Sequence, residues 1–331
     1  MLGGGLAAYG HTLTGIATNT GLYYAESGKC SAGSFENCEN TGTLSVTAKS
    51  GVAGVSSFGG ICGIVEYDGV QFKGCSNNGA ISRISAGEES TGSSTSVGGI
   101  LGRCAGSFVN ATGWSNTDAQ QPINVDRGYA VTIENCTNSA VLLSQCRHNA
   151  CIKTGGSVAR LDNVGGIVGA VVSLDASKSK ILSCTNNGKV SGGWNKDVNT
   201  TLLGGIAGLA QNVEINNCTA SGSLESISGT CVGAAGGFAG FVIKNVNVGG
   251  TSTCSASFTM KKENVNLVMW WGLALGYVKG GTASVAGVTF SSSANIDGAT
   301  LVLNGDNYKS YICNTDSNVK PSVSEDCSWS N

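Results

Sequence analysis

Proline, histidine and charge are scarce in this 331-residue chain, and each scarcity excludes a class of protein. The chain has two prolines and two histidines, charged residues make up 12% of it, and its formal net charge is −2. So little proline excludes a collagen-like or proline-rich disordered chain. A nearly neutral chain without a repeated basic stripe lacks the electrostatic footprint of a nucleic-acid-binding protein. We therefore expect no nucleic-acid partner.

Long apolar runs are also missing. The longest, at 267–278, has about twelve residues, whereas a membrane-spanning helix needs about 20. We therefore expect no insertion into a membrane. The first residues show no basic segment followed by an apolar one, so no signal peptide is visible. We expect that the numbering begins on a mature or internal fragment, or that Met1 is not the native start.

Glycine is abundant, at 51 residues, and much of it falls in a repeated pentad of two glycines, an apolar residue, any residue and a glycine. Clear copies stand at 59–63, 98–102, 165–169, 204–208 and 236–240, with weaker ones at 4–8 and 272–276. A second signature has an apolar residue, two spacers, Cys, one residue and then Asn or Ala. It occurs at 35–40, 72–77, 133–138, 181–186 and 215–220, with looser copies ending at 254–256 and near 290–294. The two signatures alternate and define seven units.

The spacing of the units is that of a repeat protein. Where nothing is inserted, successive cysteines are 37, 34 and 36 residues apart. The segments are short, β-branched and punctuated by Gly and Asn, which indicates strands rather than helices. We expect an all-β, β-helix-like solenoid over 1–300, with about seven repeats of about 35 residues each. The loop insertions are expected at 8–34, 103–130 and 141–163, and 301–331 is expected to be a capping tail.

Stacked units place equivalent residues above one another. One predicted file holds Cys38, Cys75, Cys136, Cys184, Cys218 and Cys254. A second holds Asn40, Asn77, Asn138 and Asn186, whose side-chain amides can donate to one neighbour and accept from the other. The asparagines are thus interpreted as structural. The cysteines are interpreted either as buried thiols or as disulfides. Thr137, Thr185 and Thr219 also share a position, as an ice-binding face would require, but Ser76 and Glu39 interrupt it.

The pentads GGIVG and GGIAG, followed by ILSCTNNG and INNCTASG, resemble the GLUG-type repeats of bacterial and protist cell-surface proteins. The resemblance covers about 59–256 well and both ends poorly. It implies a secreted or surface-displayed, adhesin-like repeat protein. It brings no catalytic residues, because that family has no agreed active site.

The remaining cysteines suggest local bridges. Cys146, His148 and Cys151 invite a metal interpretation, but zinc needs a fourth ligand and the other histidine, His11, is far away in the chain. We therefore favour a disulfide between Cys146 and Cys151. Cys313 and Cys327 are interpreted in the same way. An even total of 14 cysteines permits complete pairing and favours an oxidising compartment.

Four sequons for N-glycosylation begin at Asn110, Asn135, Asn199 and Asn217. Asn135 and Asn217 occupy the same repeat position, next to a cysteine of the predicted file. If these cysteines point inward, alternation turns the two asparagines outward, where each could carry a glycan in a eukaryotic host.

The function that these features favour is structural. The 21 acidic residues are spread along the chain, and none recurs in file with a base, so we expect no enzyme, no metal and no cofactor. A modular rod whose first unit has no visible cap favours an extracellular or cell-surface subunit that self-associates head to tail into a filament. The alternative is an adhesin or glycan-binding module that uses the loops of the third unit, with Trp114, and the tyrosine pair Tyr23 and Tyr24.

Overall fold

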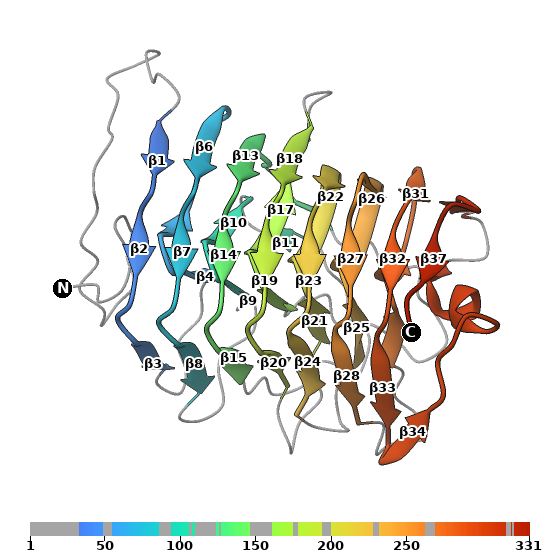
Figure 1. The fold of residues 1–331 in the computed structure, drawn as a ribbon. Coiled ribbons are helices and arrows are strands. Elements are labelled where there is room, and N and C mark those ends of the chain that lie inside the picture. Colours follow the sequence, from blue (N-terminus) through green and yellow to red (C-terminus); the bar gives the residue numbers. More distant parts are fainter. Residues whose placement is uncertain are drawn as a thin grey trace.

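The computed structural model describes residues 33–48, 55–85, 94–105, 108–109, 124–125, 127–145, 161–174, 178–193, 200–227, 232–261, 269–315, 319 and 321–331. In this part of the chain the fold is all-β. Most strands join four parallel sheets, here named A to D, and Figure 1 shows the rows of strands running from β1 at one end of the molecule to β37 at the other.

Sheet A has 13 strands. They are β1 (Ser34–Glu36), β5 (Cys62–Ile64), β6 (Val70–Lys73), β10 (Leu101–Cys104), β13 (Val131–Glu134), β17 (Val168–Val172), β18 (Ser179–Leu182), β22 (Ala207–Asn216), β26 (Ala239–Gly249), β30 (Leu275–Val278), β31 (Ala283–Val285), β35 (Cys313–Thr315) and β36 (Ser322–Val323). The first half of β22 pairs with β17 and its second half with β18, so this strand joins two rows into one sheet.

Sheet B has eight very short strands. They are β2 (Glu39–Asn40), β7 (Ser76–Asn77), β14 (Thr137–Asn138), β19 (Thr185–Asn186), β23 (Thr219–Ala220), β27 (Thr253–Cys254), β32 (Thr289–Phe290) and β37 (Ser328–Trp329).

Sheet C also has eight strands: β3 (Leu44–Ala48), β8 (Ile81–Ser85), β15 (Leu142–Gln145), β20 (Val190–Gly192), β24 (Ser223–Ser226), β28 (Ser257–Met260), β33 (Ser293–Ile296) and β34 (Ala299–Leu301). Sheet D has six: β4 (Val55–Gly59), β9 (Ser94–Gly98), β16 (Leu161–Gly165), β21 (Thr200–Gly204), β25 (Val232–Gly236) and β29 (Met269–Gly272). Outside these sheets lie the hairpin β11 (Phe108–Val109) and β12 (Asn124–Val125) and a 3-10 turn, η1 (Tyr308–Tyr311).

The chain visits the sheets in the order A, B, C and D, and each such visit is called a pass. Strands of one pass pair in parallel with the equivalent strands of the next. Ile133, for example, pairs with Phe72 on one side and Ile181 on the other. The exceptions among the described residues are the hairpin and the antiparallel pair of β33 and β34. The architecture is therefore all-β with parallel sheets, as in a β-helix-like protein.

In the outer strands, side chains alternate between the core and the solvent. In β13, Val131 and Ile133 are buried while Thr132 and Glu134 are partly exposed, so one face of the strand lines the core and the other meets solvent. Strands β16 and β17 are buried on both faces. The main core covers one side of them, and a second apolar cluster covers the other, with Leu161, Ala170, Leu209, Phe241 and Tyr277 among its members.

The glycine pairs of the pentads form the tight bend between sheets D and A. Here consecutive passes approach so closely that a side chain has no room. A Cβ at Gly166 would overlap the carbonyl oxygen of Gly205 and the side chain of Asn186. The pentad is therefore a requirement of backbone packing.

Two expected boundaries need correction. The insertion expected at 141–163 contains β15 and the start of β16, which pair in register with their neighbours in sheets C and D. Likewise, the insertion expected at 103–130 contains the end of β10. Unit three lacks the Asn-Gly turn that marks the strand of sheet C in unit four, so its strand was not recognised as part of the repeat.

The tail at 301–331 does more than cover the last unit. Its strands β35, β36 and β37 extend sheets A and B in parallel. The insertion expected at 8–34 lies outside the described residues, apart from its last two positions, of which Ser34 begins β1.

Candidate functional site

A corner residue with a left-handed backbone conformation lies between sheets A and B and sets which neighbouring side chains point into the core. The residue just before the cysteine of each of the first five units has positive φ: Asn37, Gly74, Asn135, Ser183 and Asn217. Glycine and asparagine adopt this conformation most readily, which explains their frequency here. The corner turns the following cysteine into the core and leaves Asn135 and Asn217 exposed.

The cysteines that follow these corners lie above one another in one file, here called the thiol file. Each of the later thiols donates to a carbonyl of the preceding pass: Cys75 to Phe35 at 3.3 Å, Cys184 to Ile133 at 3.4 Å and Cys218 to Ile181 at 3.4 Å. The backbone N–H of Cys75 also donates to the Cys136 sulfur at 3.4 Å. Cys38, at the first pass, is half-buried, whereas the other four are buried.

The prediction that Cys254 continues this file is wrong. Cys254 pairs with Ala220 and therefore lies in the asparagine file. Ser252 takes its place, and its hydroxyl accepts from the Cys218 N–H at 3.1 Å. The corner after Gly250 holds one extra residue, Thr251, so the thiol-file position falls at Ser252, and Cys254 stands two residues beyond it.

Cys327 is the last member of the thiol file, and it was not predicted from the sequence. Ser328 pairs with Thr289, and its N–H donates to the carbonyl of Val288 at 2.9 Å. Cys327 therefore follows Val288 in the thiol file, and its sulfur donates to Val285 at 3.6 Å, as the other cysteines do. The signal in the sequence was a cysteine directly before a Ser-aromatic-Ser segment.

All ten described cysteines are free thiols. The predicted bridge between Cys313 and Cys327 is thus not formed in the structure, and Cys146 and Cys151 lie outside the described residues. Burial raises the pKa of Cys62 and that of Cys104 to about 12, so both thiols are neutral at ordinary pH.

The asparagines form a hydrogen-bonded ladder inside the protein. The amide of Asn40 donates to Asn77 at 2.7 Å, that of Asn77 to Asn138 at 2.8 Å, and that of Asn138 to Asn186 at 2.8 Å. All four side chains are buried. Because a buried amide without a partner costs about 1–3 kcal/mol, the ladder fixes the register of four passes. It ends at Ala220.

A file of hydroxyls lies on the outer side of sheet B. Thr137, Thr185 and Thr219 continue through Thr253 and Thr289, with Ser76 at one end and Ser328 at the other. Neighbouring members bond to each other, as Thr253 does to Thr219 at 3.2 Å. The sequence showed only three threonines, because the misplaced Cys254 hid the register of the later ones. We call these seven residues the hydroxyl file.

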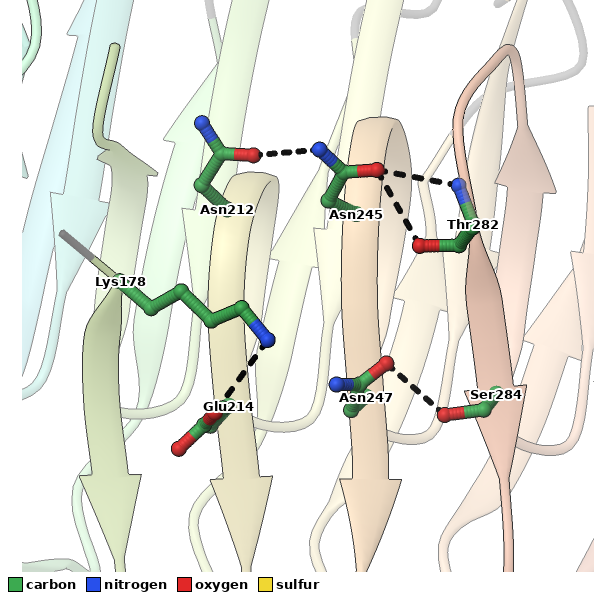
Figure 2. Close-up of polar contacts among 7 residues, drawn as sticks. All are labelled: Lys178, Asn212, Glu214, Asn245, Asn247, Thr282 and Ser284. Carbon is green, nitrogen blue, oxygen red and sulfur yellow. Dashed lines mark hydrogen bonds and ion pairs between the residues drawn. The ribbon is translucent and has the colours of Figure 1, made fainter. Parts of the chain in front are cut away.

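The outer side of sheet A carries polar contacts between passes, and Figure 2 shows those of β18, β22, β26 and β31. Lys178 pairs with Glu214 at 3.3 Å. The amide of Asn245 donates to Asn212 at 2.8 Å, and its oxygen accepts from the N–H and hydroxyl of Thr282 at 3.1 and 3.2 Å. Ser284 donates to Asn247 at 2.8 Å. Their partners all lie on neighbouring passes, so these polar groups tie the stack together.

Sequence reasoning also missed charged residues inside the protein. Asp162 is fully buried in β16, between Thr95 and Thr201 of the neighbouring strands. Arg83 and Arg103 are 4% and 7% exposed. No pattern in the sequence distinguishes these positions from ordinary outward-facing ones.

The other predicted site residues divide by whether the structure describes them. Asn135 and Asn217 are exposed, as a glycan would require, whereas Asn110 and Asn199 lie outside the described residues. The oxygen of Asn217 also accepts from the N–H of Thr251 at 2.9 Å. In the described part of the chain, no three His, Cys, Asp or Glu residues are grouped to hold a metal ion. No helix within those ranges is long and apolar enough to cross a membrane.

Comparison with known proteins adds little. No family model matches the chain, and no curated protein matches it. One solved structure, titled a "putative immunoglobulin A1 protease" from Bacteroides ovatus, is similar with a TM-score of 0.43 and 18% sequence identity. The match covers 84% of this chain and 66% of that one, so the chain spans just under two thirds of its length.

Proposed function

We propose that the chain is a structural subunit of an extracellular or cell-surface assembly, built as a solenoid of about seven GLUG-type repeats of about 35 residues. The observation that carries the proposal is that the strands at the start of the described chain have a partner on one side alone. Among the described residues, each of β1 to β5 pairs with one strand later in the chain and with nothing on its other side. Such edges are templates for the addition of another chain.

The polar side chains support a structural role. Those of the buried asparagine ladder and those on the outer side of sheet A bond between passes. The exposed Asn135 and Asn217 offer sites for glycans if the source is eukaryotic. The proposed location outside the cell rests on these two positions and on the resemblance to GLUG-type repeats.

A glycan-binding adhesin is the second candidate, and the hydroxyl file favours it. Seven hydroxyls at a regular spacing of about 4.8 Å, the distance between paired strands, suit a partner that is itself polar and repetitive, such as a linear polysaccharide. The file contains no charge between Ser76 and Ser328.

Two measurements on the purified chain separate the candidates. If the structural proposal holds, negative-stain images and sedimentation show rods that lengthen as the protein concentration rises. Stable monomers that bind members of a glycan array would favour the adhesin and overturn the structural subunit.

A further inference from the structure

The two ends of sheet B carry complementary backbone groups. At the first pass, the carbonyls of Cys38 and Asn40 accept from Ser76 and Asn78 at 2.8 Å each. Because N–H and C=O groups of a strand point alternately to its two sides, those of Glu39 face away from β7. An edge strand with free N–H and C=O groups on one side can pair with a further parallel strand.

The last pass offers matching N–H and C=O groups at its outer edge. The N–H groups of Ser328 and Ser330 donate to Val288 and Phe290 at 2.9 and 2.7 Å. The N–H and C=O of Trp329, which lies between them, therefore face away from β32. Throughout sheet B, the N–H at the hydroxyl-file position donates to the carbonyl of the thiol-file position of the previous pass, as Thr185 does to Cys136 at 2.9 Å.

We infer that a second copy of this chain stacks on the last pass head to tail and in register, with its β2 beside β37 and its β1 beside β36. The inference rests on the proposed function and names its partner and geometry. The carbonyl of Cys327 already accepts from the Tyr308 hydroxyl at 2.5 Å, and a carbonyl oxygen has two lone pairs. The Glu39 N–H of the added copy then donates to this same oxygen, at the position used by every earlier pass.

The side-chain files continue across this junction. Cys38 of the added copy follows Cys327, so a thiol stands at each side of the contact. In sheet A, Phe35 of the added copy follows Val323, and both are partly buried apolar residues at the ends of one file. In sheets A and B the junction therefore resembles the contact between two consecutive passes. The antiparallel β34 closes sheet C at the last pass, so sheets A and B carry the contact.

The junction predicts which thiols can be joined. Paired strands lie about 4.8 Å apart, within the range of about 4.4–6.8 Å between the Cα atoms of a disulfide. Mild oxidation with copper phenanthroline removes two electrons and two protons from the two thiols and forms one S–S bond. We expect a ladder of covalent oligomers whose linked peptide contains Cys38 and Cys327.

Two variants test the polarity of the contact. Cys38→Ser alone and Cys327→Ser alone should each lose the covalent ladder. A mixture of the two variants should yield covalent dimers and nothing larger, because one copy supplies Cys327 and the other Cys38. A dimer formed by Cys327→Ser alone through two Cys38 residues would mean head-to-head contact and would overturn the inference.

A backbone variant gives a readout that does not depend on cysteine. Glu39→Pro removes the N–H that faces the added copy, and proline is tolerated at strand edges. It should weaken association at least tenfold in sedimentation, whereas Glu39→Ala, which keeps the N–H, should associate like the parent. Rods that form without a Cys38–Cys327 link overturn the register but leave the proposed function standing. Absence of rods in the parent protein overturns both.

Discussion

Burial raises the pKa of two thiols in sheet A, those of Cys62 and Cys104. Cys104 is fully buried in β10 and pairs with Val171, and burial raises its pKa from 9.0 to about 12. Cys62, one pass earlier, has the same shift for the same reason. The folded state thus keeps these protons at pH values where an unfolded chain loses them.

This difference predicts a loss of stability in alkali. Between pH 9 and pH 12 the unfolded state binds fewer protons than the folded state, so the free energy of unfolding falls as pH rises. Each such thiol contributes about 1.4 kcal/mol per pH unit. Cys104→Val, which continues the packing of Val171, should remove one contribution. Urea unfolding at pH 8.5 and pH 10 measures the effect, and equal pH dependence in parent and variant would contradict it.

Among the structural elements, the bend between sheets D and A depends most on one residue type. Gly60, Gly99, Gly166, Gly205 and Gly237 follow one another in file, and a Cβ on any of them would overlap a backbone carbonyl of the next pass. The bend brings consecutive passes together without side chains between them, which is why the pentad recurs.

Gly166→Ala should therefore destabilise the protein by about 3 kcal/mol, the upper part of the range for overpacked sites. The added methyl group must push apart β17 and its neighbours or displace Asn186 from the ladder. Gly33→Ala is the matched control, because a Cβ there meets nothing within 4 Å. Thermal unfolding should lower the midpoint for Gly166→Ala alone. An unchanged midpoint would show that the bend can relax.

The whole molecule has unlike ends. The first described pass offers half-buried Phe35, Leu44 and Val46. The last passes are covered by aromatic rings: Tyr308 lies 5.9 Å from Phe290 and 5.8 Å from Trp329, measured between ring centroids. This difference gives the stack a direction, with one end sealed in part by its own tail.

Removal of an aromatic ring should loosen one end without unfolding the rest. Tyr308 is 4% exposed, and Tyr308→Ala should cost about 3–5 kcal/mol, as for other buried aromatic residues. In a stacked protein each unit contacts only its neighbours, so hydrogen exchange should rise in β31 to β37 and stay unchanged in β13 to β20. Val302→Ala, at a position 73% exposed, serves as control. Uniform loss of protection would indicate that the molecule unfolds as one unit.

Much of the arrangement could be predicted from particular residues. Asn40, Asn77, Asn138 and Asn186 stand at equal places in their units, and the structure joins them in one ladder. Cys254 could not be placed, because it stands two residues beyond the thiol-file position of its pass, where the earlier units have Asn or Ala, and the cysteine spacing hides this. The hydroxyl file was hidden for the same reason. Buried Asp162 left no signal, because the second cluster that covers its strand comes from distant segments.

The amino-acid sequence alone determined the repeat, its strands and its bends, because glycine, asparagine and alternating apolar residues act on the few residues around them. Tertiary structure decided which residues stand above one another, which thiols meet, and which of the described strands have a partner on one side alone. These depend on hydrogen bonds between residues more than 30 positions apart, such as that between Cys218 and Ser252, and a single inserted residue shifts the register of every pair that follows it in its pass.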